Sequence, residues 1–288
     1  MINIISIGEI LWDIFPDKKI LGGAPANFVF HARQFGSDAT LFTALGNDQQ
    51  GIELEENAVK AGIIMQSSRV SHPTGIADIF LNNEQVPTYK LNENCAWDHI
   101  PLTNKLKKFA KKADLIVFGT IAQRNIESRN TIQEALKLSK SSSKILFDIN
   151  LRLDFYSKEI IEESLNAANY LKLNDEEESV LQNLFNKNIE QIISDFNLEL
   201  AILTLGPKGS KIITSNSMSE CPAAKCKIVD TVGAGDSFTA FFIINYLKGM
   251  SIHESQKKSV KSCCLCLCSQ WGDCANSKRF KIIIKPQE

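Results

Sequence analysis

The sequence predicts an α/β protein of three layers, in which helices cover both faces of a mostly parallel central sheet. Short apolar segments alternate along the chain with longer segments of helical periodicity, which is the pattern of such folds. The short segments are apolar at nearly every position, as expected of strands that are buried on both faces. The expected strands are Asn3–Ile7, Ala39–Ala44, Leu115–Phe118, Ile145–Asp148, Tyr170–Leu173, Ala201–Thr204 and Lys211–Thr214.

The helices between these strands are indicated by periodicity and by the residues at their starts. Pro25 favours the first turn of a helix. Acids in the first turns of Lys158–Ala168 and Glu176–Phe185 suit the positive end of a helix dipole. The expected helices are Ala26–Gln34, Asn125–Ser139, Lys158–Ala168 and Glu176–Phe185.

One segment, residues 74–97, departs from this alternation. Two partly alternating strands, Ala77–Leu81 and Val86–Leu91, flank the polar turn Asn82-Asn83-Glu84. This pattern predicts a β-hairpin, which we expect to project from the main sheet as a small β element.

Composition and charge restrict the class of protein. The chain has 288 residues, of which 44% are hydrophobic, and 32 basic residues against 33 acidic ones give a net charge of −1. These values exclude a wholly disordered chain, and they argue against a nucleic-acid partner, which requires a basic surface. The start of the chain does not resemble a targeting signal, and no apolar run is long enough to span a bilayer. We therefore expect a cytoplasmic protein with no membrane partner.

Eight cysteines are the unusual feature of the composition, and five of them cluster near the C-terminus at Cys263, Cys264, Cys266, Cys268 and Cys274. In a reducing compartment they do not form a disulfide framework. Their spacing scatters them around a helix and provides no matched pair of Cys-x-x-Cys motifs for a tetrahedral metal site. Packing of small apolar side chains is therefore favoured over metal binding.

The most informative motif is Asp230-Thr231-Val232-Gly233-Ala234-Gly235-Asp236-Ser237-Phe238. Its small residues let backbone N–H groups approach an anion at the start of an apolar helix, where the helix dipole adds positive charge. A carboxylate at Asp236 is placed to accept a proton from a hydroxyl group. This combination is suited to phosphoryl transfer to an alcohol. The alternative is a glycine turn that only starts a helix, which the length of the string disfavours.

This string resembles the C-terminal signature of the ribokinase-like (PfkB) carbohydrate kinase family. A second string, Gly22-Gly23-Ala24-Pro25-Ala26-Asn27, resembles its N-terminal signature and continues to Phe35-Gly36 and Gly46-x-Asp48-x-x-Gly51. The resemblance covers nearly the whole chain, and no Walker-type phosphate loop is present. It implies one ribokinase-like, Rossmann-like kinase domain over residues 1–288, with a β-lid formed by about 10–21 and 72–100.

The resemblance also implies roles for individual residues. Asp236 is the implied catalytic base, and the implied anion hole is Gly233, Ala234 and Gly235. The residues implied to bind sugar hydroxyls are Asp13, Gly22, Gly23 and Asn27. Taken without the family, Gly22-Gly23 is equally a plain loop and Asp13 a solvated acid at a strand end.

ATP and Mg²⁺ are the implied cofactors, with K⁺ as a further one. The residues implied to contact the nucleotide are Asn174, Thr204, Gly206, Gly209 and Trp271. Glu177 is implied to hold Mg²⁺ through water, and Asp230 and Thr231 to bind the monovalent cation. Asn174 and Glu177 are equally explained as a helix cap, and the Thr204–Gly209 segment is equally explained as a turn. Trp271 either stacks on adenine or partly blocks the adenine pocket.

The acceptor is predicted to be fructose, converted to fructose 6-phosphate, because the segments around Trp12-Asp13, Trp97-Asp98, Gln123 and Arg152 resemble the fructokinase branch. Gln123 and Arg152 are the further candidates for sugar contact, although Arg152 also suits a nucleotide phosphate or a surface acid. The alternatives are a kinase for ribose, a nucleoside or a 2-keto-3-deoxy sugar acid, and a non-catalytic sensor of sugar or nucleotide. Paired lids imply a homodimer through Phe80, Val86 and Tyr89, which otherwise pack on their own domain.

Overall fold

The computed structural model describes residues 1–81, 87–225 and 233–267, and within them it contains a large central sheet. The strands lie in the order β13-β12-β11-β10-β9-β8-β1-β4-β5. Neighbours from β5 to β11 run parallel, whereas β12 is antiparallel to both β11 and β13. The strands of this sheet are β1 (Asn3–Ile7), β4 (Asp38–Gly46), β5 (Met65–Val70), β8 (Leu115–Gly119), β9 (Lys144–Asp148), β10 (Tyr170–Asn174), β11 (Leu200–Thr204), β12 (Ser210–Ile213) and β13 (Met218–Cys221).

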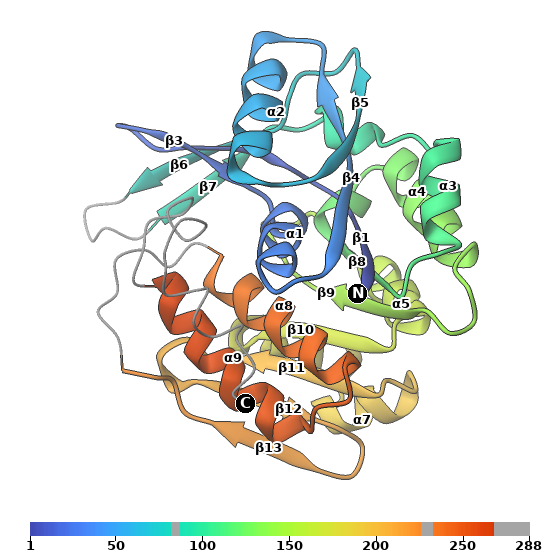
Figure 1. Ribbon diagram of the computed structural model, residues 1–288, viewed down its shortest axis with the longest axis vertical. Helices are drawn as coiled ribbons and strands as arrows, with labels where there is room; N and C mark the ends of the chain where they lie inside the picture. The colour runs from blue at the N-terminus through green and yellow to red at the C-terminus, as the bar shows by residue number, and fades with distance from the viewer. Residues whose placement is uncertain (82–86, 226–232, 268–288) are drawn as a thin grey trace.

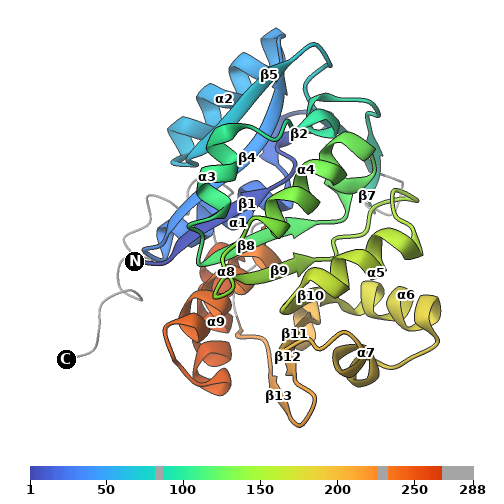
Figure 2. The same ribbon diagram turned by 90° about the vertical axis from the view of Figure 1, so that its right-hand side faces the viewer.

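Helices cover both faces of the sheet, as the alternation of elements predicts (Figures 1 and 2). One face carries α1 (Ala24–Gln34), α2 (Gln49–Ala61), α8 (Ala234–Leu247) and α9 (Ile252–Leu267). The other carries α3 (Asn104–Ala110), α4 (Ile126–Lys137), α5 (Lys158–Ala167), α6 (Asp175–Phe185) and α7 (Ile189–Asp195). Strand β1 shows how one strand supplies both cores, because Ile4 packs on the α1 and α8 side while Ile5 and Ile7 pack on the other. The predicted three-layer α/β fold is thus confirmed.

Helix α8 is apolar around its whole circumference, and the fold buries it between α1 and α9. Phe238, Phe242 and Ile243 are each less than 5% exposed. A helix without a polar face must be enclosed on all sides, so the position of its first turn is fixed by packing. This matters because the first turn carries Gly233 to Asp236.

Four short strands form a second, smaller sheet, which projects at the side of the molecule (Figure 1). They are β2 (Leu11–Ile14), β3 (Lys19–Gly22), β6 (Ile76–Leu81) and β7 (Pro87–Leu91), in the order β3-β2-β6-β7. Strands β6 and β7 pair antiparallel, which confirms the predicted hairpin. Strand β2 pairs in parallel with β6 and so joins two distant segments of the chain, both within or next to the ranges expected for a lid.

Several elements were not predicted, and most of them have weak local patterns; helix α2 is the exception, with 13 residues, an Asp48 cap and Gly62 at its end. Strand β5 lies at the edge of the main sheet and is half exposed, so its sequence Met-Gln-Ser-Ser-Arg-Val has no apolar run. Helices α3 and α7 have only 7 residues each, too few to show a clear period. Strand β13, the other edge strand, is similarly polar.

The described part of the cysteine-rich segment lies at the end of α9. Cys263 is partly buried against the core beside α8, Cys264 is also partly buried, and the later cysteine side chains lie outside the described residues. Among the described residues, no three His, Cys, Asp or Glu side chains are grouped so as to hold a metal ion. Across the same residues, no helix combines the length and the apolar character needed to cross a membrane.

Candidate active site

A cavity of about 350 Å³ lies where the carboxyl ends of the parallel strands meet the small sheet. Open α/β sheets bind ligands at this edge, because the loops that leave the strands converge there. The small sheet contributes Leu11, Asp13, Phe15, Ala77, Ile79 and Leu91. The strand ends and helix starts contribute Glu9, Gly23, Ala24, Asn27, Ile121, Asn150, Arg152, Lys172, Asn174, Thr204, Gly233, Gly235 and Asp236. Apart from Gly22, Ala234 and Gln123, the sugar and base residues predicted from the sequence all line this cavity.

The two signature motifs meet inside the cavity at a hydrogen bond between Asn27 and Asp236. Asn27 Nδ2 donates to Asp236 Oδ2 over 3.0 Å, although 209 positions separate the two residues. Asn27 lies in the first turn of α1 and Asp236 in the first turn of α8, so the contact follows from the packing of these two helices. Gly233 caps α8 in the left-handed conformation, with φ of 71°. The free N–H groups of the first turn therefore begin at the cavity.

Asp236 is partly buried at the cavity, and burial raises its pKa to about 6. The positive charge of Lys172 opposes this effect, the nearby Asp148 adds to it, and the hydrogen bond from Asn27 opposes it. A pKa just below neutrality leaves the side chain ionised at pH 7 yet able to accept a proton, which is the requirement for a general base.

Lys172, which also lines the cavity, forms a buried ion pair with Asp148, and the sequence did not predict this pair. Lys172 Nζ lies 3.0 Å from Asp148 Oδ1, and the Lys172 side chain is 9% exposed. Burial lowers the pKa of Lys172, but the carboxylates of Asp148, Glu177 and Asp236 outweigh that effect and raise it. The signal was present in the sequence, since a lysine in the otherwise apolar strand Tyr170-Leu171-Lys172-Leu173 is costly without a partner.

Glu9 is the second residue that the sequence analysis missed. It lies two residues after the end of β1, is 1% exposed, and its Oε2 has no hydrogen-bond partner among the described residues. Burial raises its pKa to about 8, with a smaller opposing effect from a backbone hydrogen bond and a further increase from Asp148. The folded protein therefore holds Glu9 mainly as a neutral acid at pH 7.

Replacing this acid by its neutral isostere is expected to stabilise the fold. The pKa of Glu9 is about 8 in the folded state against 4.5 for the free group. Above pH 4.5 the unfolded chain therefore ionises at Glu9 while the folded protein does not. This lowers the free energy of unfolding, by roughly 3 kcal/mol near pH 7. Glu9→Gln should raise the free energy of unfolding at pH 7 by roughly 1–3 kcal/mol, and the gain should vanish near pH 4. Urea unfolding of both proteins at several pH values checks this, and a variant that is less stable throughout would contradict the buried neutral acid.

Asp13 faces the cavity from β2, with glycines packed closely around it. Burial raises its pKa to about 6, against the opposing effect of Arg152. A Cβ atom at Gly22 would lie only 2.2 Å from Asp13 Oδ2, so Gly22 supports the carboxylate from behind instead of lining the cavity. Gly23 does line the cavity, and its φ of 107° and its contact with the Glu9 carbonyl both require glycine.

The structure separates the two further candidates for sugar contact. Arg152 is exposed and lines the cavity, where its charge lowers the pKa of Glu9, Asp13 and Asp236. Gln123 does not reach the cavity and is 1% exposed. Its amide donates to the Gly119 carbonyl over 3.0 Å and to Ser164 Oγ over 2.9 Å, so it joins η2 (Ile121–Gln123) to β8 and α5. The prediction for Gln123 is corrected accordingly, because buried backbone and hydroxyl groups use its polar atoms.

The residues expected to hold the nucleotide lie along the ends of β10 and β11. Asn174 and Thr204 line the cavity, and Gly206 and Gly209 belong to the short turn after β11. Glu177 forms a capping box with Asn174, and its two oxygens accept from the Asn174 and Leu151 N–H groups over 2.8 and 3.0 Å. Its role at a metal ion would therefore be through water, as Mg²⁺ commonly binds with phosphates and a few carboxylates. Trp271, Asp230 and Thr231 lie outside the described residues.

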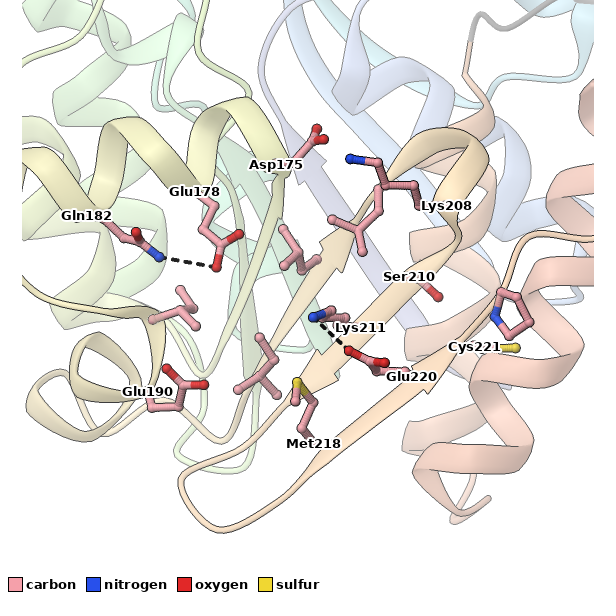
Figure 3. Close-up of a pocket in the computed structure, with 15 residues that line it drawn as sticks. Asp175, Glu178, Gln182, Glu190, Lys208, Ser210, Lys211, Met218, Glu220 and Cys221 are labelled. Carbon is pink, nitrogen blue, oxygen red and sulfur yellow. Dashed lines mark hydrogen bonds and ion pairs between the residues drawn. The ribbon is translucent and has the colours of Figure 1, made fainter.

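A second cavity, of about 640 Å³, lies between α6 and the strands β11 to β13 (Figure 3). Its polar lining includes Glu178, Glu190, Lys208 and the ion pair between Lys211 and Glu220, whose atoms are 2.7 Å apart. It adjoins the turn after β11 but contains none of the residues predicted for sugar binding or proton transfer. Although larger, it contains neither Asp236 nor the N-terminus of α8, so the first cavity is the candidate active site.

A helix N-terminus next to a carboxylate with a raised pKa, inside a polar cavity, is suited to phosphoryl transfer to an alcohol. The match to the family model "pfkB family carbohydrate kinase" extends over residues 15–274, so the chain belongs to this family of sugar kinases.

Relatives with curated descriptions agree with this assignment. A sugar kinase of Pyrococcus horikoshii is 30% identical over 260 residues, which cover 86% of this chain and 80% of that protein. Its crystal structure matches with a TM-score of 0.82 at 26% identity over 98% of this chain and 99% of that one. A fructokinase of Solanum tuberosum is 26% identical over 308 residues, covering 99% and 93% of the two chains. The structure of a fructokinase from Vibrio cholerae with fructose, ADP and calcium ion matches with a TM-score of 0.79 at 22% identity, covering 99% of each chain.

Proposed function

We propose that this sugar kinase transfers the γ-phosphate of ATP to a primary hydroxyl of fructose, giving fructose 6-phosphate. The single observation that carries the proposal is the Asn27–Asp236 hydrogen bond, which holds the Asp236 carboxylate at the N-terminus of α8 inside the cavity. ATP as donor is supported by the Pyrococcus horikoshii relative, whose structure has also been determined in complex with ATP. Fructose as acceptor is supported by the relatives described as fructokinases.

In this mechanism the chain's own residues orient the sugar and move one proton. Asp13 and Asn27 bind sugar hydroxyls, and the free oxygen of Asp236 accepts the proton of the attacking hydroxyl. The sugar oxygen then forms a bond to the γ-phosphorus as the bond to ADP breaks. The N–H groups of Gly233 to Gly235 hold the negative charge of the transferred group at the start of α8.

Mg²⁺ bound to the phosphates would neutralise part of their charge. The small sheet acts as the lid in this proposal, because it supplies one wall of the cavity and keeps water from competing with the sugar. Binding of K⁺ near Asp230 and Thr231 and a cytoplasmic location remain parts of the proposal. So does pairing of two lids through Phe80, Val86 and Tyr89, of which Val86 and the side chain of Tyr89 lie outside the described residues. Phe80 is 55% exposed on β6, which agrees with a surface available for pairing.

One observation favours a second acceptor class. Arg152 places an exposed positive charge in the cavity, which suits the carboxylate of a 2-keto-3-deoxy sugar acid. A coupled assay of ADP release with fructose, ribose, a nucleoside and such a sugar acid, each with ATP and Mg²⁺, tests both candidates. Turnover with fructose at the highest kcat/KM supports the proposal. Activity with another acceptor and not with fructose overturns the choice of sugar, and no activity with any acceptor overturns catalysis itself.

Gly235 offers a test of the anion hole that leaves the fold intact. It has a helical conformation and lines the cavity, and a Cβ atom built on it meets no atom within 4 Å. Gly235→Ala should therefore unfold at the same or a higher temperature, because alanine favours the helix. The added methyl group would occupy the path of the phosphoryl group, so kcat/KM should fall on the order of 100-fold. Thermal unfolding and steady-state kinetics check this, and unchanged kinetics would exclude an anion hole at Gly235.

A further inference from the structure

Arg124 lies beside the cavity but does not line it. It belongs to neither of the two signature strings, and they do not explain the groups that surround it. Its side chain is 7% exposed. Nε donates to Asp98 Oδ1 over 2.8 Å, and Nη2 donates to Asp98 Oδ2 over 2.7 Å. Asp98 lies in η1 (Ala96–His99), is 1% exposed, and also accepts from the Cys95 N–H. Both charges are thus enclosed in one bidentate pair, which is a geometry that lysine cannot reproduce.

The same guanidinium group reaches the base of the small sheet. Nη2 also donates to the carbonyl of Asn92 over 2.7 Å, and Asn92 directly follows β7. The Asn92 side chain accepts from the N–H of Ile76 over 2.7 Å and donates to the carbonyl of Thr74 over 3.3 Å. Asn92 therefore joins the start of β6 to the end of β7, and Arg124 holds this joint to the main domain.

Two aromatic rings enclose the guanidinium group. It lies 4.0 Å from the centre of the Trp97 ring and 4.5 Å from that of Phe155. Trp97 also abuts the start of β6, because a Cβ atom at Gly75 would lie 2.2 Å from its Nε1. Contacts of this kind add cation–π attraction and fix the plane of the arginine.

Phe155 connects the arginine to the sugar side of the cavity. It packs against Leu11, Ala77 and Leu91, and all three line the cavity from the small sheet. Its N–H donates to the carbonyl of Arg152, which lines the same cavity from the loop. Phe155 is thus the contact between the loop that carries Arg152 and the cavity wall formed by the small sheet, and the Arg124 guanidinium group packs on its ring.

We propose that Arg124 is a positioning residue that joins the base of the small sheet to the loop 150–155 and so holds the sugar-facing wall of the cavity in place. It touches neither sugar nor nucleotide. Its loss would loosen the wall on the sugar side and admit water, while the nucleotide side at the ends of β10 and β11 would keep its shape. This inference rests on the proposed function for its kinetic test, but not for its structural one.

The kinetic test uses Arg124→Lys and Phe155→Leu, with Phe185→Leu as the matched control. Lys158 lies over the Phe185 ring at 5.2 Å, a cation–aromatic pair that is not part of this network. With the sugar that the wild type turns over best, both test variants should raise KM for the sugar about tenfold and leave KM for ATP within about twofold. ADP release should exceed sugar phosphate formed, because water replaces the sugar as acceptor. Phe185→Leu should change none of these values. Unchanged sugar KM in Phe155→Leu, or the same change in both phenylalanine variants, overturns the inference.

Hydrogen–deuterium exchange provides the structural test, which needs no turnover. Both test variants should speed amide exchange in residues 74–78 and 90–98 and leave exchange in α8 unchanged. If Arg124→Lys does not fold, Phe155→Leu carries the test, because it leaves the buried ion pair intact. Uniform acceleration over the whole chain would show a general loss of stability and overturn the inference. If no sugar is turned over but these segments alone exchange faster, the proposed function fails and the positioning role stands.

Discussion

Asp236→Asn is expected to lower kcat by about 10²–10⁴-fold, the usual contribution of a general base. The asparagine keeps the shape of the side chain and can still accept the hydrogen bond from Asn27, which measures 3.0 Å in the native protein. It cannot accept a proton, so the attacking hydroxyl stays protonated. Sugar affinity should remain near the native value, since Asp13 and the rest of the cavity are unchanged.

Kinetics by coupled assay and sugar binding by calorimetry check this result together. The pH dependence provides a second check, because the pKa of Asp236 is raised to about 6. Native activity should therefore decrease as pH falls through about 6, where the base becomes protonated. Near-native kcat in Asp236→Asn would remove Asp236 from the role of base and leave it as an acid favoured by the helix dipole in the first turn of α8.

Lys172→Met is expected to lower the free energy of unfolding and to raise the pKa of Asp236. The lysine is 3.0 Å from Asp148 and buried, so its removal leaves an uncompensated carboxylate in the core. Breaking a buried pair in this way costs about 3–5 kcal/mol. Lys172 also lowers the pKa of Asp236, so its loss should raise that pKa above about 6 and move the acid side of the pH–activity profile to higher pH.

The double variant Lys172→Met with Asp148→Asn separates the two effects. Removing both charges should restore much of the lost free energy of unfolding, because no unpaired charge then remains in the core. The acid side of the pH–activity profile should move back only in part, since Lys172 lowers the pKa of Asp236 by more than Asp148 raises it. Urea unfolding and pH–rate profiles of the single and double variants check this. A single variant as stable as the native protein, with an unchanged profile, would contradict the role assigned to Lys172.

Much of the fold was predictable because it depends on neighbours in sequence. Strand β10 and helix α6 follow from an apolar run and from the cap Asn174 with Glu177 three positions later. Helix α8 follows from small residues before an apolar segment. Such patterns involve residues that are close in the sequence, so they can be recognised without knowledge of the tertiary structure. The same holds for Asp236, the proposed base, whose string is local.

The tertiary structure decided which polar groups face one another. Nothing near Lys172 in the chain indicates that Asp148 and Asp236 surround it, and nothing near Gln123 indicates that Ser164 and Gly119 engage its amide. Nor does the chain order bring Asn92, Asp98 and Phe155 to Arg124. Burial turns these encounters into strong constraints, because a polar group removed from water must find its partner within the fold. The sequence therefore supplied the strands, the helices and the chemical groups, whereas packing determined their ionisation, their partners and the wall that encloses the sugar side of the cavity.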